Sequence, residues 1–326
     1  MDKITLTTFT DPMMGLSYEC EPVFRKLETH FAGQIEFKYS MGLLVRDCYE
    51  FMIPSDYSNT PEETINRYNA RLAKIYESEE SISGMPIIMD RFCLFDTEHT
   101  SSLPLNLAYK AALLTESELA DRFLYNLRYA TIVDTRPTTK LEEILKVVRQ
   151  TGIDEQRFLQ HYRNGNAETA LHGDLTRMHA LGIHTLPAYL LEMTEQREPS
   201  NACNDSAESR QKSGEGQYDG KQMLIKHLVG YNTFVEAIQH ISNGCIHPQP
   251  VMQSLQSIRQ LLEQHPLISP IEVREALDFH TVDEVRKFIQ PLIDSREINI
   301  RDIKRGWFIE NVRKREFDVR KVLKKL

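Results

Sequence analysis

The chain has 326 residues, 41% of them hydrophobic and 26% charged, a composition typical of a soluble globular protein with one large or two modest domains. Its formal net charge of −8 excludes a general attraction of the whole body to nucleic acid or to an anionic membrane. No run approaches the roughly eighteen apolar residues of a membrane-spanning helix. Residues 1–9 also lack the apolar core of a secretory signal, so we expect no membrane partner.

The cysteines are odd in number, scattered, and form no C-x-x-C pair. This pattern argues against a disulfide framework and against a zinc site. His172 and His179 fall on one expected helix, but no carboxylate or cysteine completes a ligand set, so we expect no metal. The sequence therefore predicts a reduced, cytoplasmic chain without a resident cofactor. The five cysteines are Cys20, Cys48, Cys93, Cys203 and Cys245.

The first forty residues predict a strand, a helix and a second strand. Residues 4–9 alternate in the manner of a strand, and Asp11-Pro12 ends it. Residues 17–32 carry apolar side chains at helical spacing, and Ile35, Phe37 and Tyr39 alternate again. A strand, helix and strand at this spacing imply a parallel pair of strands.

Residues 59–180 have a helical pattern throughout. Thr60-Pro61 is a typical helix start, with a capping side chain followed by proline at the first position. Ser102-Leu103-Pro104 begins another helix, and further helices are expected over residues 116–131, 140–151, 154–162 and 167–181. We interpret this block as a helical insertion over about residues 55–182.

Strand character returns at residues 188–193, and a further strand is expected over 222–229. Between them, residues 194–220 are rich in polar side chains, which predicts a mobile loop. A helix capped by Thr233 follows and runs to Ile241. The complete order, βαβ, helical insertion and ββα, is the thioredoxin arrangement with an insertion, here assigned to residues 1–245.

A linker at residues 243–250 precedes a second pattern over residues 249–310. Helices are expected over residues 251–264, 270–277 and 282–295, followed by a hairpin turning at Lys304-Arg305-Gly306. Three helices followed by a two-stranded ribbon predict a winged-helix-like α+β module. The tail, residues 311–326, holds seven Lys or Arg against Glu316 and Asp318, a local net charge of +5.

The motif after the first strand resembles that of the DsbA-like thioredoxin-fold superfamily, especially its cytoplasmic branch of dithiol–disulfide isomerase-like proteins. The resemblance covers about residues 4–244 and implies an α/β, thioredoxin-like fold. Met14 and Ser17 occupy the places where the family has its two redox cysteines. The matching residues are Asp11-Pro12, Tyr18, Glu21-Pro22 and Met41-Gly42-Leu43-Leu44.

The loss of both cysteines removes the chemistry of the family. Exchange needs a thiolate activated at a helix N-terminus and a second thiol that resolves the mixed disulfide. A Met14 thioether does not ionise, and a Ser17 hydroxyl resolves no disulfide. We therefore interpret both as vestigial positions, and Cys20, one turn deeper, as a core residue.

The second motif, His184-Thr185-Leu186-Pro187, resembles the cis-proline loop that faces the cysteine pair in this family. There the residue before the proline offers its backbone to an extended peptide. The resemblance thus implies a cis Pro187 and an apolar, Met-rich groove suited to binding a peptide or protein partner. The predicted groove residues are Met13, Met14, Leu16, Thr185, Leu186 and Pro187.

Three functions stay open. The first is a non-catalytic binding or adaptor protein that uses this groove. The second is an enzyme similar to kappa-class glutathione transferases and their isomerase relatives, with glutathione as cofactor and Ser17 or His184 as its active residue. The third is a regulator that contacts nucleic acid through Arg301, Lys304 and Arg305 of the hairpin and the tail. The helix expected at residues 282–295 mixes basic with acidic residues, which disfavours the third reading.

Overall fold

The computed structural model describes residues 3–194, 218–219 and 222–312. Most of the predicted mobile loop and of the basic tail, together with Cys203, lies outside these residues. In the part of the chain that is described, no helix is long and apolar enough to cross a membrane.

Five strands form the main sheet, in the order β2-β1-β3-β5-β4. The parallel pair expected from the sequence is present, because β1 runs parallel to β2, and the remaining pairs are antiparallel. The short strand β4 was not predicted. The strands are β1 (Lys3–Thr10), β2 (Ile35–Met41), β3 (Ala188–Thr194), β4 (Tyr218–Asp219) and β5 (Gln222–Lys226).

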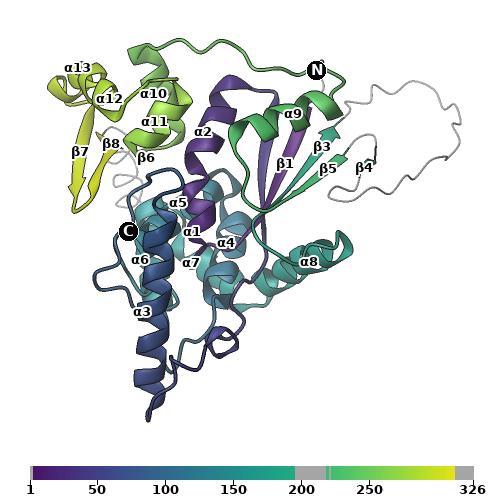
Figure 1. Ribbon diagram of the computed structural model, residues 1–326, viewed down its shortest axis with the longest axis vertical. Coiled ribbons are helices and arrows are strands. Elements are labelled where there is room, and N and C mark those ends of the chain that lie inside the picture. Colours follow the sequence, from purple (N-terminus) through teal and green to yellow (C-terminus); the bar gives the residue numbers. More distant parts are fainter. Residues whose placement is uncertain (1–2, 195–217, 220–221, 313–326) are drawn as a thin grey trace, which may run out of the picture.

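Helices α1 (Gly15–Glu19), α2 (Glu21–His30) and α9 (Tyr231–Ile241) accompany this sheet. The single helix expected over residues 17–32 is thus two helices, because Pro22 near the start of α2 has no N–H to continue α1. Figure 1 shows α2 and α9 beside the strands, and their apolar residues share one core with Ile4 and Leu6 of β1.

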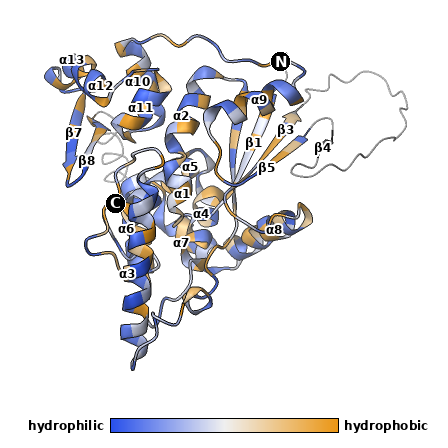
Figure 2. Ribbon diagram, viewed as in Figure 1, coloured by the Kyte–Doolittle hydropathy of each residue, from blue (hydrophilic) through white to orange (hydrophobic). Residues whose placement is uncertain are grey.

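Between β2 and β3 the chain is helical, as predicted. Thr60 caps its first long helix by accepting a hydrogen bond from the Glu63 N–H, and Asp154 caps a later one. Figure 2 shows hydrophilic and hydrophobic residues interspersed on α3 and α8, as expected for helices with one side exposed. The elements are η1 (Cys48–Phe51), α3 (Pro61–Glu79), α4 (Leu103–Thr115), α5 (Ser117–Ile132), α6 (Leu141–Thr151), α7 (Glu155–Arg163) and α8 (Asn166–Ala180).

The C-terminal module contains helices and an antiparallel sheet of three strands in the order β6-β8-β7. Strand β6 was missed, and the helix expected over residues 282–295 is divided at Pro291 into two. The element order is helix, strand, three helices and a hairpin. The elements are α10 (Leu255–Gln264), β6 (Leu267–Ile268), α11 (Pro270–Ala276), α12 (Val282–Phe288), α13 (Gln290–Asp294), β7 (Ile298–Ile303) and β8 (Gly306–Asn311).

Candidate functional site

Met14 and Ser17 form a closed, buried pair at the start of α1. Met14 is the residue that precedes the helix and is 6% exposed, while Ser17 is 1% exposed. The Ser17 hydroxyl donates to Met14 Sδ over 3.4 Å and accepts from Thr10 Oγ1 over 2.7 Å. The hydroxyl is therefore committed to internal partners, which leaves the glutathione alternative without an available serine.

Asp11 holds the backbone around this pair. Its buried carboxylate accepts hydrogen bonds from the Met13 N–H at 3.0 Å and the Leu44 N–H at 2.8 Å. Ser102 Oγ and Asn106 Nδ2 donate to the same carboxylate over 2.7 and 2.8 Å. Burial raises the pKa of Asp11, and these four hydrogen bonds oppose the rise. The Asp-Pro motif thus joins the end of β1 to the segment after β2 and to the start of α4.

The loop before β3 packs against the segment that follows β2. The Leu186–Pro187 peptide bond is cis, and Leu186 packs so closely on Gly42 that a Cβ there would lie 2.6 Å from Leu186 Cδ1. Thr185 and His184 are exposed. The backbones of Thr185 and Leu186 make no hydrogen bond to any residue that the structure describes, so this stretch can still pair with an extended chain.

The residues of the predicted groove differ in accessibility. Met13, Met14 and Pro187 are buried, whereas Leu16 and Leu186 are half-buried and Thr185 is exposed. Met13 belongs to the core, because it packs with the helical part of the chain. Of the six, Leu16, Thr185 and Leu186 remain at least partly accessible.

The described cysteines offer no activated thiol near α1. Cys20 is buried with its Sγ 3.1 Å from the Tyr189 hydroxyl, and burial raises the pKa of its thiol to about 12. Burial likewise raises the pKa of Cys48 to about 11. A thiol with a raised pKa is protonated at neutral pH and is a poor nucleophile, as expected for the core role predicted for Cys20.

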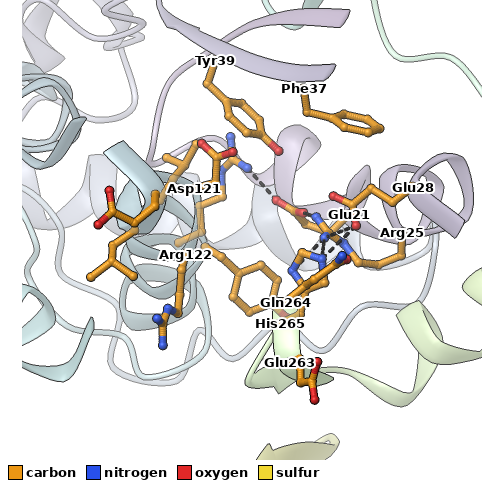
Figure 3. A pocket seen from close by; sticks show the side chains of 15 residues that line it. Glu21, Arg25, Glu28, Phe37, Tyr39, Asp121, Arg122, Glu263, Gln264 and His265 are labelled. Carbon is orange, nitrogen blue, oxygen red and sulfur yellow. Dashed lines mark hydrogen bonds and ion pairs between the residues drawn. The ribbon is translucent and has the colours of Figure 1, made fainter. Parts of the chain in front are cut away.

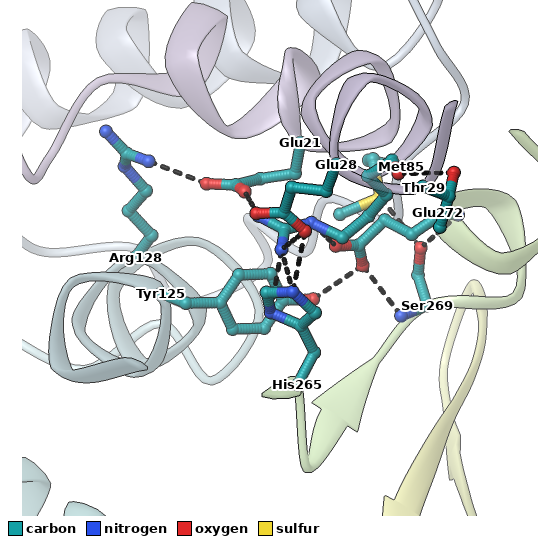
Figure 4. A network of polar contacts seen from close by, with 10 residues as sticks. Glu21, Glu28, Thr29, Met85, Tyr125, Arg128, His265, Ser269 and Glu272 are labelled. Carbon is teal, nitrogen blue, oxygen red and sulfur yellow. Dashed lines mark hydrogen bonds and ion pairs between the residues drawn. The ribbon is translucent and has the colours of Figure 1, made fainter. Parts of the chain in front are cut away.

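Behind the pair, a buried chain of charges crosses the molecule (Figure 4). Arg128, fully buried, donates to Thr10 Oγ1 over 2.9 Å and pairs with Glu21 over 2.7 Å. Glu21 pairs with Arg25 over 2.9 Å, and Arg25 pairs with Glu28 over 2.6 Å. Burial alone would disfavour the charged form of Glu28, yet Arg25 and His265 hold its pKa at about 2.

This network continues into the C-terminal module. His265, at the end of α10, lies 2.8 Å from Glu28 and contacts Arg25, and burial and Arg25 lower its pKa. Glu272 of α11 accepts from the Tyr125 hydroxyl over 2.7 Å. Burial raises the pKa of Glu272 to about 7 although Arg25 opposes the rise. No pattern in the sequence predicts this network, in which only Glu21 belongs to a motif noted above.

The hairpin residues expected to contact nucleic acid face the helical part of the same chain. Lys304 pairs with Asp90 over 2.6 Å, and Arg305 pairs with Glu80 over 3.0 Å. Arg301 lies 3.6 Å from an oxygen of Asp134 and pairs with Glu310 of the neighbouring strand over 3.4 Å. Each of the three cations thus has an acidic partner in the same chain. A phosphate group would compete with that partner, which counts against a phosphate-binding role.

The fold and the residues around α1 define a protein with a thioredoxin-like fold. A family model described as Thioredoxin matches residues 7–208, more than half of the chain. The chain therefore belongs to the thioredoxin family, which confirms the predicted thioredoxin-like fold. No curated protein matches it.

Solved structures similar to this chain include several proteins of disulfide chemistry. A putative protein disulfide isomerase from Nitrosomonas europaea is 18% identical, with 60% of this chain and 87% of that chain covered and a TM-score of 0.48. The cytosolic disulfide reductase DsbM from Pseudomonas aeruginosa is 16% identical, with 59% and 89% covered and a TM-score of 0.42. A probable DsbA oxidoreductase from Streptomyces coelicolor is 12% identical, with 77% and 94% covered and a TM-score of 0.49.

Proposed function

We propose that this thioredoxin-family protein performs no dithiol–disulfide exchange and acts as a non-catalytic adaptor that binds a peptide or protein. The observation that carries the proposal is the pair at the start of α1, where Met14 and Ser17 bind each other and no thiol is present. Neither a thioether nor a neutral hydroxyl supplies the thiolate that exchange needs.

The binding half of the proposal rests on the loop at residues 184–187. The backbones of Thr185 and Leu186 point to no internal hydrogen-bond partner among the described residues, and the side chains of Leu16 and Leu186 remain partly exposed. An extended peptide would pair with this backbone in the manner of an added strand, while the apolar side chains favour apolar residues of the partner. The four described cysteines are free, so we place this function in the reducing cytoplasm.

Cross-linking followed by affinity capture of the full chain tests the binding surface. Leu186→Asp puts a charge onto the surface and is expected to remove the specific partners, whereas Leu186→Ala weakens them less. The matched control is Leu114→Asp, since Leu114 is an exposed leucine of α4 away from this loop. Circular dichroism verifies that each variant is folded. If Leu186→Asp retains the same partners as the control, the loop is not the binding surface.

A further inference from the structure

A cavity of about 450 Å³ lies where three parts of the chain meet. Figure 3 shows Phe37 and Tyr39 of β2 on one side, Asp121 and Arg122 of α5 on another, and Gln264 and His265 from the end of α10 opposite the strand. Its volume falls within the range of small-molecule sites. The C-terminal module thus completes a cavity that the rest of the chain leaves open.

One wall of the cavity is the buried charge network. Glu21, Arg25, Glu28 and Arg128 line it, and they pair with one another through the ion pairs described above. The guanidinium groups of Arg25 and Arg128 each pair with at least one carboxylate, so neither is free to bind an anion. An anionic ligand that pairs with Arg25 or Arg128 would have to break a buried pair, which costs several kcal/mol.

The remaining lining contains acidic side chains, aromatic rings and one arginine, Arg122. Glu118 and Asp121, one turn apart on α5, both have exposed side chains. Five carboxylates face three guanidinium groups, so the lining carries a net charge of −2 with His265 neutral. The rings of Phe37 and Tyr39 and the side chain of Leu119 supply apolar surface. The Tyr39 hydroxyl makes no hydrogen bond to any residue that the structure describes, and it accepts as well as donates.

We propose that this cavity binds an organic cation, an ammonium or guanidinium group on a short aliphatic stem. The charged head pairs with Asp121 and Glu118, whose charges give this part of the lining a negative potential. The stem lies along Leu119 and the aromatic rings, and the rings attract the cation further. Such a head group belongs either to a free amine or to a lysine or arginine side chain of a partner protein.

Isothermal titration calorimetry of the full chain separates these two sources. The probes are agmatine, a free guanidinium compound, and a capped Gly-Arg-Gly peptide, with the corresponding citrulline peptide as an uncharged isostere. We expect at least one cationic probe to bind at micromolar to millimolar concentration, and more weakly as salt is added. Binding of agmatine alone identifies a small-molecule site, and binding of the peptide alone identifies a side-chain pocket.

The variant Glu118→Gln/Asp121→Asn is expected to weaken binding of the cationic probe by about tenfold or more, because two charge-assisted contacts are lost. Glu142→Gln/Asp283→Asn makes the same chemical changes at exposed positions outside the cavity and is expected to leave the affinity unchanged. The proposal is overturned if neither cation binds, if the citrulline peptide binds as tightly, or if both variants behave alike.

Discussion

Two glutamates, one at the end of α1 and one beside this helix, are less stable in their charged form because of burial. Glu79 Oε2 lies so close to Gly15 that a Cβ on this glycine would be 1.9 Å away. The same oxygen has no hydrogen-bond partner among the described residues. Glu19 is buried and bonded on one side to Ser83. Burial raises the pKa of each carboxyl to about 7, and the Glu79 charge adds to the rise at Glu19. The folded protein therefore favours the neutral form of both.

The substitution Glu79→Gln is expected to stabilise the protein at pH 8 by about 1–3 kcal/mol and to have little effect at pH 4. A carboxyl whose pKa rises on folding contributes stability below its unfolded pKa of about 4.3. That contribution is lost as the pH rises through about 7. Urea unfolding at several pH values measures the difference, with the exposed Glu77→Gln on the same helix as control. A gain that is equal at pH 4 and pH 8 contradicts the assignment.

At the scale of elements, α2 lies between the main sheet on one side and helices α5 and α11 on the other. One side places Phe24, Leu27 and Phe31 in the core that also contains β1 and β3. On the other side, Glu21 pairs with Arg128 of α5 and with Arg25 of its own helix. Arg25 also lies 3.6 Å from the Glu272 carboxylate of α11. A helix that is charged on a buried side is stable only if each charge has a partner.

Replacing Arg128 with Met removes the partner of Glu21 on α5 and is expected to destabilise the protein by about 3–5 kcal/mol, because a buried carboxylate then loses a cation. Chemical denaturation followed by far-UV circular dichroism gives the value. Arg157→Met, an exposed arginine of α7, is the matched control and should change little. Adding Glu21→Gln to Arg128→Met should recover part of the loss. A loss below about 1 kcal/mol would show that the pair contributes little.

The elements were largely predictable because their signals are local. Caps and prolines at Thr60, Asp154 and Pro270 mark helix starts that the structure contains. The network was not predictable, since Glu21 and Arg128 are 107 residues apart in the sequence, and Glu28 and His265 are 237 apart. Two helix predictions were wrong for a reason that is also local in the sequence. Apolar spacing indicated one continuous helix in each case, whereas Pro22 and Pro291 divide it into two.

The candidate site was predicted in part. A motif of adjacent residues located Met14 and Ser17 at the start of α1, and the same motif implied the loop that contains Pro187. Apolar character, however, does not distinguish a surface residue from a core residue. Met13 and Met14 were therefore expected in a groove, whereas the structure buries both.

For the whole molecule, the C-terminal module is part of one continuous structure. Its hairpin pairs with Glu80 and Asp90, and Phe308 packs on Tyr129 with ring centroids 4.9 Å apart. Its α10 and α11 supply His265 and Glu272 to the buried network. The module thus contacts both α2 and the helical part of the chain. We infer that the fold of the thioredoxin family is retained here while its redox chemistry is absent.

The most direct test of that claim is a dithiol–disulfide exchange assay on the full chain beside the variant Met14→Cys/Ser17→Cys. We expect no turnover by the wild-type protein, because neither Met14 nor Ser17 provides a thiolate. The variant should form a disulfide between the two introduced thiols, shown by thiol titration, and should gain measurable turnover. Wild-type turnover comparable to that of a C-x-x-C thioredoxin-fold enzyme would contradict the account.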